Sequence, residues 1–346
     1  MTQTRKNETL PQKIARQWKT NPLFSTACVL VLMVILQTLA LGFHYDSVGA
    51  WFTQWTRNWI NILRNNASVG IVALGMTFVI ISGGIDLAVG STLVAVGAVL
   101  MVCVNSYPTG LLTSIGITGV PAFIIGIIAC ILMGCALGGV SGFLIAKQKL
   151  PAFIATLGMM KICRSVTQQV MQTASVKVPT QFLAIANTKI GGQVILPIIY
   201  WLVLAVLLHI ISRKTTFGRH VYAIGSNERT ARLSGINVEK VIAMVYVLSG
   251  IMVSIAAIIQ VARIGSMDYA NAGSGYEMDA IAAVVVGGTS MSGGKGSILG
   301  TVLGMLIIAV MNNLLNLMGV PPFLREAFKG FIVIAAVLLQ KKEKNS

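Results

Sequence analysis

Long apolar segments alternate with short polar connections along almost the whole chain. A helix crosses a bilayer with about 20 predominantly apolar residues, and most of these segments approach or exceed that length. The pattern predicts an all-α polytopic membrane protein with about ten transmembrane segments. The segments cover residues 23–43, 66–84, 87–105, 121–146, 152–172, 195–212, 241–262, 280–290, 297–318 and 323–340.

The composition excludes the soluble classes of protein. Of the 346 residues, 55% are hydrophobic and only 10% are Asp, Glu, Lys or Arg, whereas an ordinary soluble protein has about 25% of these charged residues. The stretch from Leu87 to Ala146 contains no charge at all. A soluble enzyme and a disordered chain are therefore both excluded.

The net charge of +16 is compatible with nucleic-acid binding, but the cations are distributed as in a membrane protein. They precede the first apolar segment, follow the last one and gather in the connections 147–150, 213–240 and 291–296. An even number of crossings places these connections and both termini on one side, and their positive charge makes it the cytoplasmic side. We expect contact with anionic lipid and no nucleic acid.

This topology divides the chain into three parts. We expect a basic cytoplasmic tail over residues 1–22, a transmembrane domain over 23–340 and a cytoplasmic tail over 341–346. Two places depart from simple crossings. Lys161 and Arg164 lie near mid-membrane, which predicts either a partly re-entrant segment or a pair facing a cavity. The three Trp of residues 51–65 favour an interfacial helix before the second crossing.

Glycine pairs interrupt the apolar pattern in two places about two hundred residues apart. Each pair ends an apolar segment, and each is followed by a Gly-Ser pair and a new apolar segment. Transporters are often built from internal repeats with broken helices near the substrate site. We therefore predict an internal repeat with a helix break or gate. Its residues are Gly83, Gly84, Asp86, Gly90, Gly287 and Gly288.

Asp86 is the only charged residue between Arg64 and Lys147. A carboxylate at a membrane helix centre costs about 2.5–3.5 kcal/mol on insertion scales, so such residues are functional candidates. Asp86 also precedes the apolar run that begins at Leu87, and Asp is a favoured helix N-cap. We interpret Asp86 as a cap for that helix rather than as a substrate or gate contact.

Residues 287–297 are rich in glycine like a phosphate-binding loop, but they do not match its spacing. The Walker pattern has four residues between Gly and Gly-Lys, followed directly by Ser or Thr. Here five residues separate Gly288 from Gly294, and Gly296 follows Lys295. The cysteines and histidines form no cluster of metal-ligand spacing. We expect no metal, cofactor or catalytic residue in this chain, so energy from ATP must come through a partner.

The connection 213–240 is the one sizeable polar segment between apolar segments. Ser226 or Asn227 can cap a short helix, Glu228 suits its first turn, and Gly235 can end it. A charged helix of two turns with an apolar edge is either a docking element or a solvated loop, and the residues alone leave both readings open.

Five stretches of the chain resemble bacterial ABC sugar-transporter permeases of the ribose type, with their xylose, arabinose and galactose relatives. The resemblance extends from about residue 61 to residue 339. Its motifs occur in order along the chain. They are residues 83–91, 151–158, 218–228, 231–238 and 276–290.

The resemblance implies a permease subunit of an ABC importer in the bacterial inner membrane, moving a ribose-like pentose or a hexose into the cytoplasm. It implies a separate ATP-binding subunit that holds ATP and Mg, a periplasmic sugar-binding protein, and a second permease copy, identical or different. It also places the ATPase contact in the polar connection, with Ala231 and Leu233 as an apolar edge and charged residues at the rim. The coupling residues are Asn227, Glu228, Arg229, Ala231, Arg232, Leu233 and Gly235.

Other functions stay open at this stage. A permease of the same architecture could carry a nucleoside, an autoinducer or a branched amino acid, although a zwitterionic cargo would favour charges facing the cavity. An ion-coupled secondary transporter would need intramembrane carboxylates, and only Asp86 is available. A sugar needs hydroxyl and amide partners along its pathway. The candidates are Thr77, Ser82, Asn312, Asn313 and Asn316.

Overall fold

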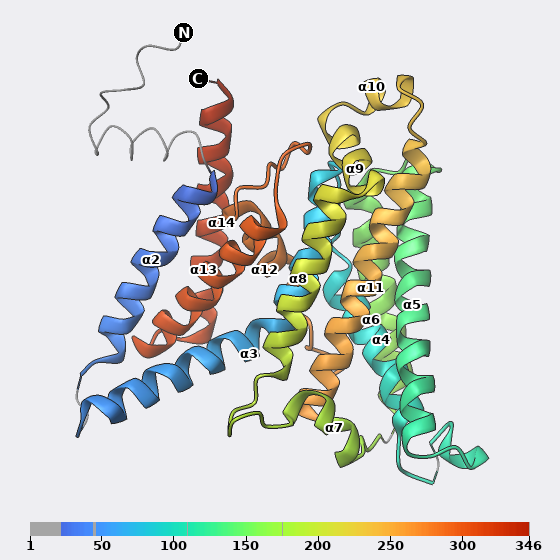
Figure 1. Cartoon of the computed structure of the whole chain (residues 1–346). Coiled ribbons are helices and arrows are strands. Elements are labelled where there is room, and N and C mark those ends of the chain that lie inside the picture. Colours follow the sequence, from blue (N-terminus) through green and yellow to red (C-terminus); the bar gives the residue numbers. More distant parts are fainter. Residues whose placement is uncertain (1–21, 44–45, 109, 175, 346) are drawn as a thin grey trace.

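The computed structural model describes residues 22–43, 46–108, 110–174 and 176–345, and this part of the chain is all-α. The predicted tail 1–22 lies outside the described residues except for Pro22, which begins a helix. The helices are α2 Pro22–Leu41, α3 Val48–Ile81, α4 Val89–Val104, η1 Thr113–Ile115, α5 Val120–Ala146, α6 Ala152–Met171, α7 Thr180–Asn187, α8 Leu196–Lys214, α9 Thr216–Ser226, α10 Glu228–Leu233, α11 Val238–Ile264, α12 Tyr276–Val286, α13 Ile298–Leu317 and α14 Pro322–Asn345 (Figure 1).

Six helices in the described part are long and apolar enough to cross a membrane: α2, α3, α5, α8, α11 and α13. The chain is therefore a polytopic membrane protein. Two other predicted segments form helices that are too short for a complete crossing. A rise of 1.5 Å per residue gives about 24 Å for the 16 residues of α4, against a hydrocarbon core of about 30 Å. The 11 residues of α12 span only about 16 Å.

The predicted interfacial helix over residues 51–65 is not a separate element. It forms the first half of α3, a continuous helix of 34 residues. Trp51, Trp55 and Trp59 lie one turn apart. The rings of the first two stack with centroids 6.4 Å apart, and those of the last two are tilted with centroids 5.9 Å apart. No break separates the half that carries these Trp residues from the buried half, which begins at Ala67. The two halves therefore form one continuous helix.

The predicted segment with two mid-membrane cations is likewise one continuous helix, α6, and is not re-entrant. Its buried residues recur at every fourth position, from Ala155 through Met159 and Cys163, which places them on one face. Lys161 is exposed, whereas Arg164 is half-buried and contacts another part of the chain. The two cations therefore do not act as a pair, because only Arg164 turns toward the packed chain.

Helix α11 lies at the centre of the bundle, packed against α3, α4 and α5. Its contact with α5 depends on small residues that recur at helical spacing. A side chain at Gly134, Gly138 or Gly142 of α5 would collide with backbone or side-chain atoms of α11, and one at Gly250 of α11 would collide with α5. Small residues at this spacing allow membrane helices to approach closely.

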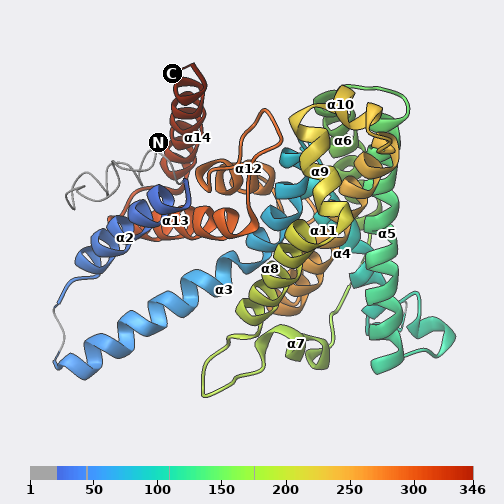
Figure 2. The ribbon, with the colours of Figure 1, turned by 45° about the horizontal axis from the view of Figure 1, so that its top comes forward.

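The connections alternate between the two ends of the bundle as the topology predicts. In Figure 1 the connections 147–150, 213–240 and 291–296 gather at the top, together with the start of α2 and the end of α14. The long connections on either side of α7 and before α5 lie at the bottom. Figure 2 shows α2, α13 and α14 on one side of the molecule and α4, α5, α6 and α11 on the other. Residues 341–345, predicted as a tail, continue α14.

Candidate functional site

The first predicted helix break ends α3 with a hydrogen-bonded glycine turn. The N–H of Gly83 donates to the carbonyl of Ile80, and the N–H of Gly84 donates to the carbonyl of Val79, each at 2.9 Å. Gly83 has a φ of +86°, a left-handed conformation that favours glycine. The pattern is the Schellman motif, and it satisfies carbonyls that the helix end would leave unpaired.

The second break ends α12 with the same turn. The N–H of Gly288 donates to the carbonyl of Val285 at 2.9 Å, and the N–H of Thr289 donates to the carbonyl of Val284 at 3.1 Å. Gly288 also has a φ of +86°. Two apolar segments far apart in sequence therefore end with the same backbone hydrogen bonds at corresponding glycines.

The two breaks meet at the base of the polar connection. The N–H of Gly294, in the loop after the second break, donates to the carbonyl of Ile81 at the end of α3, at 2.9 Å. Gly225 of α9 lies against both groups so closely that a side chain there would overlap them. The hydroxyl of Tyr222, also on α9, donates to the carbonyl of Gly296 at 2.9 Å. Helix α9 thus joins the polar connection to both breaks.

Asp86 lies after the first break and does not cap α4 as predicted. The helix begins at Val89 rather than at Leu87, and its cap position is Ala88, which makes no side-chain capping bond. One carboxylate oxygen of Asp86 instead accepts from the N–H of Ala88 at 3.0 Å, and the other accepts from the hydroxyl of Ser249 on α11 at 3.0 Å. A bond to the N–H two residues on is an Asx turn, so the chain turns before the helix starts.

Two further break residues make close helix contacts. Gly90, in the first turn of α4, lies against Gly273 and the carboxylate of Glu277. Gly287, at the end of α12, lies against the backbone of Gly300 in α13. The six predicted break residues therefore do not form one cluster: Gly83 and the loop after Gly288 meet at α9, while Gly90 packs against the connection between α11 and α12.

The polar connection contains the predicted short helix, α10. The side chain of Asn227 accepts from the N–H of Thr230 at 2.9 Å, which caps the start of the helix. The N–H of Gly235 donates to the carbonyl of Arg232 at 3.1 Å, and its φ of +81° ends the helix. Both predicted ends are confirmed. They could be predicted because each depends on a bond between residues only three apart.

The predicted apolar edge of α10 is wrong at one position. Leu233 is 83% exposed, whereas Ala231 is only 4% exposed and belongs to the core of this chain. Residues two apart lie on opposite sides of a helix, because neighbours on one face are three or four apart. Leu233 and the exposed Arg229 are therefore available to a partner, and Ala231 is not.

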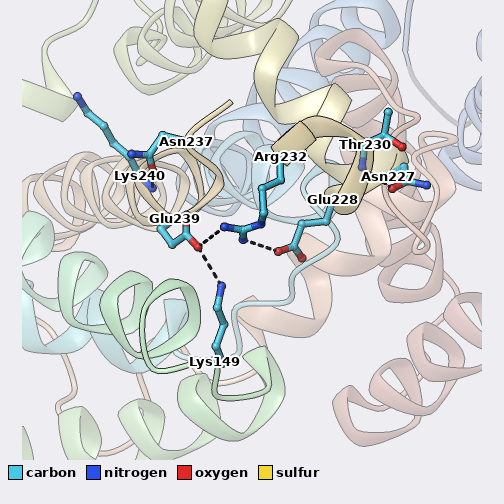
Figure 3. A network of polar contacts seen from close by, with 8 residues as sticks. All are labelled: Lys149, Asn227, Glu228, Thr230, Arg232, Asn237, Glu239 and Lys240. Atoms are coloured by element: carbon cyan, nitrogen blue, oxygen red, sulfur yellow. Dashed lines mark hydrogen bonds and ion pairs between the residues drawn. The ribbon is translucent and has the colours of Figure 1, made fainter. Parts of the chain in front are cut away.

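An ion-pair network holds α10 to the rest of the chain (Figure 3). The guanidinium of Arg232 donates to Glu239 of α11 at 2.6 Å and to Glu228 at 3.1 Å. Lys149, in the connection between α5 and α6, reaches the same carboxylate of Glu239 at 3.3 Å. These hydrogen bonds raise the pKa of Arg232 above its ordinary value. Glu228 and Arg232, predicted at the rim of a partner contact, thus bind within the chain.

The predicted pathway hydroxyls are satisfied inside the helix packing. Thr77 is fully buried, and its hydroxyl lies 2.7 Å from that of Thr301 on α13 and 2.8 Å from the carbonyl of Ala73. The hydroxyl of Ser82 donates to the carbonyl of Val79 at 2.7 Å. Both side chains bind their own helices or a packed neighbour, so they are not directed at a solute.

The three predicted asparagines lie further along α13, about 17 Å from Thr301 at 1.5 Å per residue. Asn313 exchanges hydrogen bonds with Asn58 of α3, each 3.2 Å long. Asn316 accepts from Arg325 of α14 at 3.1 Å. The buried oxygen of Asn312 has no hydrogen-bond partner among the described residues. The five pathway candidates therefore do not form one site.

Comparison with known proteins identifies relatives over most of the chain. A family model described as the permease component of a branched-chain amino acid transport system matches residues 58–337. The ribose import permease protein RbsC of Escherichia coli K12 is 40% identical, over 92% of this chain and 94% of its own length. The xylose transport system permease protein XylH of Haemophilus influenzae is 31% identical, over 91% and 96%.

An inner membrane ABC transporter permease protein of Escherichia coli K12, YjfF, is 37% identical over 84% of this chain and 85% of its own length. No solved structure matches the chain. The motifs that carry the resemblance in the sequence all lie within residues 58–337, which the family model matches.

Proposed function

Because the chain belongs to the family of branched-chain amino acid and sugar ABC permeases, we propose that it is the membrane subunit of an importer for a ribose-like or xylose-like monosaccharide. The observation that carries the proposal is similarity over 94% and 96% of the lengths of two sugar permeases, at 40% and 31% identity. Such a chain is a transport subunit of the inner membrane and not an enzyme. It moves its cargo without a chemical step.

The proposed topology has ten membrane-inserted segments with both ends in the cytoplasm. The six full-length helices cross, and α6 and α14 complete two more crossings. The short helices α4 and α12 each begin or end at a glycine break and span only part of the bilayer, and the non-helical residues beside each of them complete the crossing, as in broken transporter helices. The top of Figure 1 is then the cytoplasmic side, and the cation-rich connections found there agree with the positive-inside rule.

Three partners complete the importer. A cytoplasmic ATP-binding subunit holds ATP and Mg and docks on α10, where Leu233 and Arg229 are exposed. A periplasmic sugar-binding protein delivers the sugar at the opposite end of the bundle. A second permease copy, identical or different, faces the first across the pathway. The link from α10 through α9 to both helix breaks then transmits the ATPase movement to the membrane helices.

Deletion of the gene in its own host tests the cargo. We expect loss of binding-protein-dependent uptake of radiolabelled ribose or xylose at micromolar concentrations, restored by expressing the chain from a plasmid. Uptake of leucine is the matched control and should not change. Loss of leucine uptake with normal pentose uptake would contradict the proposal, and it would assign the chain to an amino acid cargo.

A further inference from the structure

The chain between α11 and α12, residues 265–275, does not stay outside the membrane helices. We call this segment the α11–α12 loop. Its Met267 packs on Gly97 of α4, and its Gly273 packs on Gly90 of the same helix. Seven residues of a helix separate these two contacts, or about 10 Å along its axis. The loop therefore extends beside α4 toward the first turn of that helix, as its rising path from the lower end of α11 shows (Figure 1).

Arg164 fixes the depth of this loop. It lies twelve residues after the start of α6, about 18 Å along the helix, near the middle of a core about 30 Å thick. Its guanidinium donates to the loop carbonyls of Ala272 at 2.8 Å, Ala270 at 3.2 Å and Tyr269 at 3.4 Å. A cation in the membrane needs such partners, and backbone carbonyls outside a helix need donors.

The loop also carries three exposed polar side chains. Asp268, Asn271 and Ser274 are all exposed. One carboxylate oxygen of Asp268 accepts from the N–H groups of Ala270 at 2.8 Å and Asn271 at 3.2 Å, and the other accepts from the side-chain amide of Asn271 at 2.9 Å. These bonds fix the carboxylate and the amide side by side and leave further lone pairs and one amide hydrogen unused.

Irregular backbone and a charged side chain at membrane depth are not tolerated against lipid. They occur only where protein buries them or where they line a water-filled cavity. The three exposed side chains are not buried by the described residues of this chain, so they face either water or the second permease copy across the pathway. A fixed carboxylate beside an amide offers hydrogen-bond acceptors and a donor, which is what a polyol requires.

We propose that the α11–α12 loop lines the sugar pathway and that Asp268 and Asn271 bind hydroxyl groups of the passing monosaccharide. The inference rests on the proposed function, since it assigns contacts to the cargo named there. It replaces Thr77 and Ser82, whose hydroxyls are already bonded within the helices. Arg164 is a positioning residue in this arrangement: it holds the loop at depth through its backbone and does not touch the sugar.

Thiol labelling tests whether the loop faces water. Asn271→Cys and Ser274→Cys, each in the complete importer in proteoliposomes, are treated with a negatively charged methanethiosulfonate. Val206→Cys is the matched control, because Val206 is 60% exposed on the apolar helix α8, and the unsubstituted chain gives the background of its own cysteines. We expect both loop cysteines to react at least about tenfold faster than the control, since only they meet water, and ribose or xylose to slow the reaction. Reaction no faster than Val206→Cys, or no effect of either sugar, would overturn the inference.

Transport kinetics test the contact itself. Asn271→Ala and Asp268→Asn should raise the sugar concentration that gives half-maximal uptake by about threefold to tenfold, as expected for one or two lost hydrogen bonds. Gln172→Ala, an exposed amide after α6, should leave it unchanged, and membrane abundance controls for folding. If the unsubstituted importer moves neither pentose, the proposed function fails. If it does and both variants match it, only this inference fails.

Discussion

Substitution of Gly225 by Ala should uncouple transport, because this residue lies where α9 touches both helix breaks. A Cβ at Gly225 would overlap the carbonyl of Ile81 and approach the N–H of Gly294 to 2.5 Å. Those two groups form the 2.9 Å hydrogen bond that joins the end of α3 to the loop after α12. All of these atoms are backbone, so no side chain can rotate away and α9 itself must move.

The size of the effect follows from two terms. Overpacking of a close contact costs about 1–3 kcal/mol, and loss of the hydrogen bond between Ile81 and Gly294 adds about 0.5–1.5 kcal/mol. The sum is about 1.5–4.5 kcal/mol, concentrated at one contact. We expect Gly225→Ala to lower the melting temperature of the detergent-solubilised permease and, more strongly, the amount of sugar moved per ATP hydrolysed.

Gly158→Ala is the matched control for this experiment. Gly158 lies on α6 with no atom within 4 Å of the position a Cβ would take, and Gly to Ala in a helix is favourable by about 1 kcal/mol. It should leave uptake per ATP unchanged and keep or raise the melting temperature. If Gly225→Ala behaves like Gly158→Ala in both measurements, α9 does not link the polar connection to the breaks and the reasoning is refuted.

Three further substitutions test the account. Leu233→Asp should release the ATP-binding subunit during co-purification without loss of permease, whereas Ala231→Asp should lower permease abundance, because it places a charge in the core; the reverse pattern would be inconsistent with the observed faces of α10. Arg232→Ala should reduce sugar-stimulated ATP hydrolysis more than Arg229→Ala, because only Arg232 binds α11; equal effects would argue against a role for the ion-pair network. Asp86→Asn keeps an oxygen acceptor and should retain most uptake, and Asp86→Leu should lower folded yield; loss of uptake in well-folded Asp86→Asn would mean that the charge itself is required.

Features that depend on neighbours in the sequence could be predicted. The ends of α10 follow from Asn227 and Gly235, whose bonds reach residues three positions away. The turns at Gly83 and Gly288 follow from glycine after an apolar run, because a helix end favours a left-handed residue there. The alternation of cation-rich and cation-poor connections can also be read directly from the number of Lys and Arg residues in each connection.

Features that depend on residues far apart in the chain could not be predicted. Lys149 and Glu239 are 90 positions apart, and no local pattern brings them together. The same holds for Gly225 and Ile81, whose contact depends on how α9 lies on α3. The burial of Ala231 could not be predicted, because an apolar residue on a short exposed helix can face either a partner or its own core, and only the packing decides between them.

The position of the α11–α12 loop could be predicted only in part from the sequence. A mid-membrane Arg164 requires partners. Its partners are backbone carbonyls of Tyr269, Ala270 and Ala272, and backbone groups carry no residue type that a sequence could reveal. The loop also appears as an ordinary polar connection, because nothing local indicates that Gly273 lies against Gly90.

Uptake in proteoliposomes tests the central claim most directly, namely that this chain moves sugar with ATP hydrolysed by another subunit. The permease is reconstituted alone and together with its ATP-binding subunit and sugar-binding protein, and radiolabelled pentose is supplied with ATP, a proton gradient or a sodium gradient. The account predicts accumulation only in the complete importer and only with ATP. Accumulation by the permease alone, driven by either ion gradient, would contradict it.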